Sequence, residues 1–409
     1  MKNKMTGKYL LVLLAMCGMG GASVGLMTNV AGLFFTPVSE AFNISRASVS
    51  FTLTIANLAF ALIGLIVPKL VNENNLKQVI IAAAAVEAGC TILLSISPNI
   101  IVMYIFNLLR GMAAGILGFV LITMVVNNWF KANVALVTSI ALGFSGLVAA
   151  IFSPIVSSVI AAAGWRLGYV FVGIMMVVFN LPAIFFLPAI DPHYKGELAY
   201  GETQIVEPRK VTDDMDEMPG KKIYMPLFVL ACIYAVFICC GTAMPQHFPG
   251  VAESYNVATI GALLLSVGMI ANTGGKLICG ILIDRIGTFK SVLIYLGLIM
   301  TGTLMFLLFH TGTMLLLGAL LFGMVYSLGS VGLVMMSKDL FGIENYSRTY
   351  PTISMFGTLA NAIFSTLVGF FYDISGGYTS TLVLLLVLMI ISFVIVVGSY
   401  TIRARQLAK

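Results

Sequence analysis

Long apolar runs recur about every thirty residues along this 409-residue chain, and this repeat most constrains its fold. Hydrophobic residues make up 60% of the sequence and charged residues only 9%, against about 25% charged in an ordinary soluble domain. About 20 apolar residues cross the hydrocarbon core as a helix, because a helix pairs its own backbone amides where water is absent. The sequence therefore predicts an all-α polytopic membrane protein.

The hydropathy pattern predicts twelve transmembrane helices in two six-helix bundles. The N-terminal bundle is expected over 1–190, a polar central loop over 191–222 and the C-terminal bundle over 223–409. A solvated connector between two equal halves is typical of transporters with a substrate site between related bundles. The alternative is a flexible linker in another kind of twelve-helix protein. The spans, each placed to within about three residues, are 9–34, 48–70, 78–96, 99–127, 135–162, 168–188, 223–247, 258–283, 291–310, 313–337, 351–375 and 379–402.

The basic residues predict the orientation. All but four of the 22 Lys and Arg residues lie in the termini or in the even-numbered connections between spans. Arg46 and Arg166 lie in the opposite set of connections, and Arg110 and Lys276 lie inside apolar runs. Because Lys and Arg in short loops are retained in the cytoplasm, we expect a multi-pass protein of the cytoplasmic (inner) membrane with both termini cytoplasmic. This bias also accounts for the net charge of +6, so no nucleic-acid partner is expected.

Nothing in the sequence indicates an enzyme. It contains no Walker sequence, no Cys-x-x-Cys pair and no nucleophile-base constellation, so neither an enzymatic activity nor a cofactor is expected. The cysteines all lie within predicted spans, where they behave as small apolar residues and suggest neither disulfides nor a metal site. They are Cys17, Cys90, Cys232, Cys239, Cys240 and Cys279.

The connection between the eighth and ninth spans carries a recognisable motif. Gly280, Asp284, Arg285 and Gly287 follow the order G-x-x-x-D-R-x-G, which resembles the loop motif of the major facilitator superfamily. The resemblance implies two bundles that rock about a central site. We expect Gly280 to let helices approach closely, Asp284 to cap or neutralise a helix end and Arg285 to anchor the loop in the cytoplasm. The matching region of the first half, 64–77, looks like a decayed copy.

Other stretches resemble the monocarboxylate-porter branch of that superfamily, which includes oxalate/formate antiporters. The resemblance implies a secondary transporter of a small organic anion, working by proton symport or anion exchange. Its expected partners are that anion, protons in the case of symport, and the lipid bilayer, and we expect a monomer. Two alternatives stay open: a transporter of another solute, including drug efflux, and a non-transporting sensor with this fold. The stretches are 32–47, Asn128-Trp129-Phe130, Gly143 with Gly146, Gly164-Trp165-Arg166, and 341–378.

Lys276 is the first candidate for substrate binding. It interrupts the predicted eighth span about eight residues, or about 12 Å, before Asp284. An ionisable side chain inside a span usually faces a cavity or a partner, so a cation here indicates an anion-binding group. Asn272 lies one turn earlier on the same helix face and offers a hydrogen bond. In the branch that the chain resembles, the position of Lys276 is commonly an Arg that binds the substrate carboxylate. The alternative is a Lys that reaches the cytoplasmic interface through its aliphatic stem.

Glu87 and Arg110 form a second candidate pair. The third and fourth spans are expected to form an antiparallel hairpin that turns near Pro98, which places both residues at nearly equal depth. Opposite charges in hydrocarbon are more stable together than apart, so a structural ion pair is one interpretation. The other is proton coupling, in which protonation of Glu87 releases Arg110 to reorganise or to contact substrate. Arg110 and the following Gly111 also resemble the superfamily's fourth-span R-G motif.

Two further polar residues are candidates for the substrate cavity. Asn29 follows a glycine-rich run in the first span, and Tyr326 lies in a span that would border the cavity. For each of them, the alternative is an ordinary hydrogen bond between helices. The small residues of the run are expected to let the first helix pack closely on its neighbours; they are Gly18, Gly20, Gly21 and Gly25.

Overall fold

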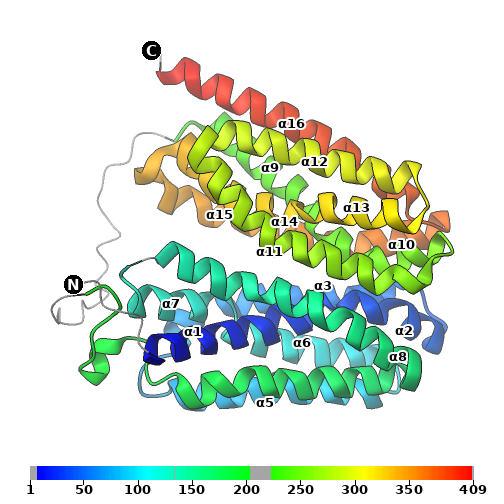
Figure 1. Ribbon diagram of the computed structural model, residues 1–409, viewed down its shortest axis with the longest axis horizontal. Coiled ribbons are helices and arrows are strands. Elements are labelled where there is room, and N and C mark those ends of the chain that lie inside the picture. The colour runs from blue at the N-terminus through cyan, green and yellow to red at the C-terminus, as the bar shows by residue number, and fades with distance from the viewer. Residues whose placement is uncertain (1–6, 133, 203–222, 408–409) are drawn as a thin grey trace. The chain divides into compact units, whose positions relative to one another are not determined.

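The computed structural model describes residues 7–132, 134–202 and 223–407, and most of them lie in helices (Figure 1). Within these residues the only strand-like pairing is an isolated bridge between Phe130 and Tyr200. The chain divides into two compact units. Unit 1 comprises 1–43 and 51–214, and unit 2 comprises 44–50 and 215–409. Most of the predicted central loop, 203–222, lies outside the described residues.

Unit 1 is built around α8, which packs against α1, the π-helical segment η1 and α5, while α5 packs against α6. Most of α3 belongs to this unit, and its first turn belongs to unit 2. The elements are α1 (Gly7–Gly20), η1 (Gly21–Asn29), η2 (Ala31–Phe34), α2 (Phe35–Phe42), α3 (Arg46–Gly64), α4 (Val67–Leu70), α5 (Leu76–Leu93), η3 (Leu94–Ile96), α6 (Ile100–Leu117), α7 (Phe119–Trp129), α8 (Val134–Phe186) and η4 (Pro192–Lys195).

In unit 2, α15 packs against α9, α11 packs against α13, and α12 packs against both α13 and α16. At the end of α9 the chain changes to the short 3-10 segment η5, which contains Pro245 and leads directly into α10, whose second residue is Pro249. The elements are α9 (Met225–Ala243), η5 (Met244–His247), α10 (Phe248–Ser254), η6 (Ala258–Ile260), α11 (Gly261–Ile286), α12 (Thr288–Leu308), α13 (Gly312–Gly323), α14 (Val325–Ser327), η7 (Leu328–Gly332), α15 (Leu333–Ser375) and α16 (Thr379–Leu407).

The described residues contain eleven helical runs that are long and apolar enough to cross a membrane. One of them, Leu136–Phe186, has 51 residues, far more than the roughly 20 that one crossing needs. It breaks at Gly164, where φ is 81° and ψ is 165°. The run therefore supplies two spans, and the predicted fold of twelve membrane helices is confirmed. A connection of five residues, 163–167, was expected between these spans. In the structure only Gly164 departs from helical backbone angles.

Similar breaks occur in unit 2. Gly342 inside α15 has φ 75° and ψ 164°, and Gly287 between α11 and α12 has φ 84° and ψ 159°. This region of backbone conformation is essentially restricted to glycine, because a Cβ atom would clash there. Each of these glycines therefore joins two helices without a loop.

The glycine-rich run of the first span lies against α8. A Cβ atom added to Gly18 would stand 2.1 Å from the carbonyl oxygen of Phe179, and one added to Gly25 would stand 2.9 Å from that of Ser145. Any side chain at these positions would force the helices apart. The prediction that small residues permit close packing in the first span is confirmed.

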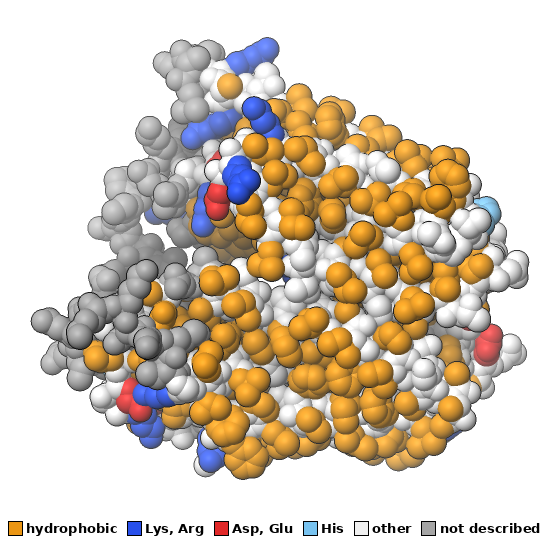
Figure 2. Space-filling view, viewed as in Figure 1, with side chains coloured by type: hydrophobic (Ala, Val, Ile, Leu, Met, Phe, Trp, Pro, Cys, Tyr) orange, Lys and Arg blue, Asp and Glu red, His pale blue; other side chains and the backbone are white. Residues whose placement is uncertain are grey.

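Large apolar side chains remain on the outside of both units, as Figure 2 shows for one face of the molecule. Leu65 is 74% exposed and Phe185 is 70% exposed. The cores are also apolar, with Trp129 and Phe130 fully buried in unit 1 and Phe248 fully buried in unit 2. A helical protein that is apolar inside and outside has lipid, not water, as the solvent for its outer surface.

Candidate functional site

Lys276 and Asn272 lie one turn apart on α11 in unit 2. The side chain of Lys276 is half-buried, and no ion pair joins it to an acidic side chain among the described residues. Asn272 is buried, and its Oδ1 has no hydrogen-bond partner there, while its Nδ2 lies 3.8 Å from the sulfur of Met269. The helix therefore presents an uncompensated ammonium group and an unsatisfied amide oxygen on neighbouring turns.

The helices around Lys276 bring further polar groups to the same part of α11. The Tyr295 hydroxyl on α12 donates a 2.7 Å hydrogen bond to the carbonyl oxygen of Gly275. On α14, the Ser327 Oγ would lie 2.8 Å from a Cβ atom on Gly275, and this Oγ is itself buried without a partner in the described chain. The preceding residue, Tyr326, has a buried hydroxyl group beside Gln246. The structure thus places Tyr326 next to a residue that contacts the Lys276 turn.

Glu87 on α5 is the centre of a second polar cluster, in unit 1. Its side chain has no exposed surface. Asn180 on α8 donates a hydrogen bond from Nδ2 to Oε2 of Glu87 at 3.3 Å, and Ser23 on η1 lies beside the same carboxyl group. Oε1 has no partner of good hydrogen-bond geometry among the described residues. Three elements therefore enclose one carboxyl group and leave one of its oxygens unsatisfied.

Arg110 on α6 is buried in the same unit, and its charge interacts with Tyr169, Glu87 and Cys90. Within the described residues Glu87 and Arg110 do not form an ion pair. The direct ion pair, one of the two interpretations from sequence, is therefore not formed in this structure. The Nε of Arg110 is buried without a partner in the described residues, so both members of the pair keep unused hydrogen-bonding capacity.

Asn29 occupies the last position of η1 and is buried. The residue before it, Thr28, donates a long hydrogen bond of 3.5 Å to Oδ1 of Asn57. Asn29 belongs to unit 1. Lys276, Asn272 and Tyr326 belong to unit 2.

The structural roles of the residues in the loop motif, 280–287, differ from those expected from sequence. A Cβ atom added to Gly280 would meet nothing within 4 Å, so the expected close helix contact at Gly280 is wrong. Asp284 and Arg285 are exposed, and within the described residues neither side chain forms a hydrogen bond or an ion pair with another residue. The expected cap by Asp284 is therefore not formed. Gly287 is the position where the motif requires a glycine, because its backbone angles exclude other residues.

Sequence reasoning missed Ser23, Asn180 and Ser327. Asn180 offered a usable signal, because it is a lone amide in an otherwise apolar run, and buried polar residues in membrane helices usually have a specific partner. The serines offered none, since hydroxyl groups in helices commonly bond to the carbonyl one turn earlier.

A family model described as Major Facilitator Superfamily matches residues 16–335, more than three quarters of the chain. The chain belongs to the major facilitator superfamily. This superfamily member is 23% identical over 390 residues to the uncharacterized MFS-type transporter YcxA of Bacillus subtilis (strain 168), covering 90% of this chain and 88% of YcxA. It is also 23% identical over 332 residues to the uncharacterized MFS-type transporter YhjX of Escherichia coli (strain K12), covering 78% of each chain.

Solved structures show the same fold. The nucleoside transporter NupG, in a mutant form, matches with a TM-score of 0.69 at 12% identity, covering 96% of this chain and 99% of NupG. A bacterial homolog of the human lysosomal transporter Spinster, inward-facing and unoccupied, matches with a TM-score of 0.67 at 14% identity, covering 98% of each chain. The protein is therefore a polytopic major facilitator transporter, and these structural similarities carry no information about its substrate.

Proposed function

We propose that this major facilitator transporter moves a small organic anion of the monocarboxylate type across the cytoplasmic membrane, by proton symport or anion exchange. The observation that carries the proposal is the ammonium group of Lys276, which lies within a membrane helix and has no acidic partner among the described residues. A charge in that position is stabilised by a counter-ion, and a carboxylate substrate supplies one.

The groups near Lys276 are suited to the rest of a small carboxylate. Asn272 and Tyr326 are polar, and the unsatisfied Oδ1 of Asn272 can accept a hydrogen bond from a substrate donor. An ammonium group is a compact charge and does not impose the two-pronged geometry of a guanidinium. We therefore expect a site that selects for negative charge and small size more strictly than for the shape of the carboxylate.

Glu87 and Arg110 are the proposed proton-coupling residues. Glu87 is held by Asn180 without a direct ion pair, so its carboxyl group is not locked in the charged state by contact with a guanidinium. A buried carboxyl group that changes protonation changes the field on a nearby buried arginine. Asn29 and Arg110 are proposed as contributions of unit 1 to substrate binding.

Uptake into proteoliposomes tests the proposal. Purified protein is reconstituted, and labelled small carboxylates are supplied with an inward proton gradient in one arm and with the same anion preloaded inside in the other. We expect saturable uptake that Lys276→Gln lowers at least tenfold and that an exposed control, Lys290→Gln, leaves within twofold. A gradient-driven signal identifies symport and a preload-driven signal identifies exchange.

Three results would contradict the proposal. Unchanged apparent affinity in Lys276→Gln would remove the anion-binding role. Uptake of neutral or cationic solutes, but of no carboxylate, would identify a transporter of another solute. Specific binding without any flux would identify a sensor.

A further inference from the structure

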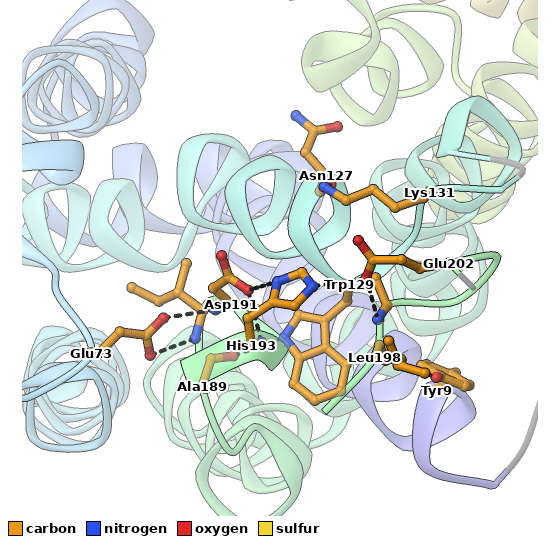
Figure 3. A network of polar contacts seen from close by, with 12 residues as sticks. Tyr9, Glu73, Asn127, Trp129, Lys131, Ala189, Asp191, His193, Leu198 and Glu202 are labelled. Atoms are coloured by element: carbon orange, nitrogen blue, oxygen red, sulfur yellow. Dashed lines mark hydrogen bonds and ion pairs between the residues drawn. The ribbon is translucent and has the colours of Figure 1, made fainter. Parts of the chain in front are cut away.

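A short segment that follows α8, residues 189–202, is bound across one end of unit 1 in a way that the transport proposal does not use (Figure 3). We call this segment the strap. It lies outside the membrane-spanning helices, at the end of unit 1 that the charge pattern predicts to be cytoplasmic. All of it except residues 189 and 190 was expected from sequence to be part of a solvated central loop. In the structure they form a dense network of polar contacts.

The first part of the strap is fixed by the turn between α4 and α5. Glu73 accepts two backbone hydrogen bonds, from the N–H of Ile190 at 2.9 Å and from that of Asp191 at 2.7 Å. The carbonyl of Ala189 accepts a 3.0 Å hydrogen bond from the indole of Trp129. Charge-assisted hydrogen bonds of this kind are the stronger ones in proteins, so this end of the strap is anchored.

The last part of the strap lies against α1 and the end of α7. Tyr9 donates a 2.9 Å hydrogen bond to the carbonyl of Leu198, and Lys8 forms an ion pair with Glu197. Tyr200 exchanges backbone hydrogen bonds with Trp129 and Lys131, each 2.8 Å long. These contacts bring three aromatic side chains together. The ring centroid of Tyr9 lies 5.5 Å from that of Tyr200 and 6.4 Å from that of Trp129.

His193 joins the two parts. Its Nδ1 lies 2.7 Å from Asp191 Oδ1 and its Nε2 lies 2.8 Å from Glu202 Oε2. Its side chain is 7% exposed. An ionised carboxylate can only accept hydrogen bonds, so both ring nitrogens must carry a proton for both contacts to form. The geometry therefore describes an imidazolium ion between two carboxylates. The other charged groups of this network are Glu73, Lys8 and Glu197, with Lys131 turned to the carbonyl of Asn127.

We propose that the protonation state of His193 controls whether the last part of the strap stays bound. The imidazolium of His193 holds residues Glu197 to Glu202 against α1 and α7, and its deprotonation releases them. A neutral imidazole can donate to only one of the two carboxylates. The second carboxylate then faces a ring lone pair and repels it, so the Glu202 end separates while the Glu73 end stays anchored.

Release has a geometric consequence for the whole transporter. Glu202 is the last described residue before 203–222, the segment that leads to unit 2. The six residues from Glu197 to Glu202 span about 20 Å when extended. Protonation of His193 therefore sets how much chain is available between the two units. This inference is independent of which solute is carried.

Tryptophan fluorescence tests the inference directly. The chain has two tryptophans, and Trp165 lies beside Phe42 and Tyr169, away from the strap. In a Trp165→Phe background all tryptophan fluorescence comes from Trp129. Its quenching by acrylamide is measured in detergent from pH 5.5 to 9.5. We expect quenching to rise at least twofold along a single titration whose midpoint lies above 6.5, the ordinary pKa of histidine.

Substitutions identify the titrating group. His193→Gln should give high, pH-independent quenching, because a neutral amide cannot replace the imidazolium. Glu202→Gln should lower the midpoint, because it removes one of the two charges that stabilise the protonated ring. His310→Gln, at an exposed histidine of unit 2, should leave the curve unchanged. An unaltered titration in His193→Gln, or low quenching throughout the range in that variant, would overturn the proposal.

Hydrogen exchange provides a second measurement should Trp165→Phe not fold. The native chain and His193→Gln are compared at the same pH, so that the intrinsic chemical exchange rates cancel. Amides of 197–202 should exchange at least tenfold faster in the variant at pH 6 and at similar rates at pH 9. Equal protection at pH 6 would overturn the proposal in the same way.

Discussion

Asn180 Nδ2 donates a 3.3 Å hydrogen bond to Oε2 of Glu87, and this contact joins α8 to α5 inside unit 1. Because Glu87 has no exposed surface, the amide is one of the few groups that replace the water this carboxyl group would otherwise bind. Asn180 therefore both stabilises the helix pair and fixes which carboxyl oxygen is engaged. The other oxygen, Oε1, has no hydrogen-bond partner of good geometry among the described residues.

Replacing Asn180 by Ala should destabilise the protein by about 1–3 kcal/mol, the usual penalty for leaving a buried polar group without a partner. Thermal unfolding in detergent measures the effect. Ser158→Ala, an exposed site on the part of α8 before the break at Gly164, should stay within about 0.5 kcal/mol of the native chain. In a Glu87→Gln background the Asn180→Ala loss should change, because the two residues interact directly. Equal losses in both backgrounds would show that Asn180 acts elsewhere.

Gly111 should tolerate no side chain. A Cβ atom there would stand 2.3 Å from the carbonyl oxygen of Ala56, so Gly111→Ala must push α6 away from α3. We expect a loss of about 1–3 kcal/mol in unfolding free energy, as for other overpacked contacts. Gly89→Ala on α5 is the matched control, since a Cβ atom there meets nothing within 4 Å. Similar melting temperatures for the two variants would refute the close contact.

Gly287→Ala tests the part of the loop motif that the backbone explains. Its φ of 84° and ψ of 159° are accessible essentially to glycine alone, so alanine should cost about 1–3 kcal/mol. Gly297→Ala, in the middle of the adjoining α12 with open space around it, should be neutral or stabilising by up to about 1 kcal/mol. The comparison is made by thermal unfolding, and a harmless Gly287→Ala would mean that another residue forms the turn.

The strap predicts how stability depends on pH. Burial by itself would lower the pKa of His193, but Glu202 and Asp191 outweigh burial and raise the pKa from 6.5. A group with a raised folded-state pKa stabilises fully below its unfolded value and loses that contribution as the pH rises through the folded value. The difference in melting temperature between the native chain and His193→Gln should therefore be largest near pH 6 and should shrink above 6.5. A constant difference from pH 6 to pH 9 would contradict the protonated state of His193.

The sequence predicted the class of fold because hydropathy reports directly on the solvent around each helix. Hydropathy could not predict that Gly164 alone would separate two spans, since that depends on one pair of backbone angles. The motif in 280–287 located the right connection but not the role of each residue. Gly280 and Gly287 are chemically identical in sequence, and only the backbone shows that Gly287 is the constrained one.

The candidate residues divide in the same way. Glu87, Arg110 and Lys276 could be found because charge in an apolar run is conspicuous. Asn180 was overlooked because its significance comes from its position opposite Glu87 on another helix, which no local pattern encodes. The strap was overlooked because its proline, Pro192, and its charges match an ordinary solvated linker, while its fixed position depends on Glu73, far away in the sequence.

The glycines at 164, 287 and 342 have a practical consequence for anyone who labels this transporter. Where one residue serves as the whole connection, an inserted epitope or fluorescent protein would have to break two helices at once. The turn after α15 is different, because Gly376 and Gly377 lie between two helices with open space around both. Fusions and reporter peptides therefore belong there rather than at the shorter turns.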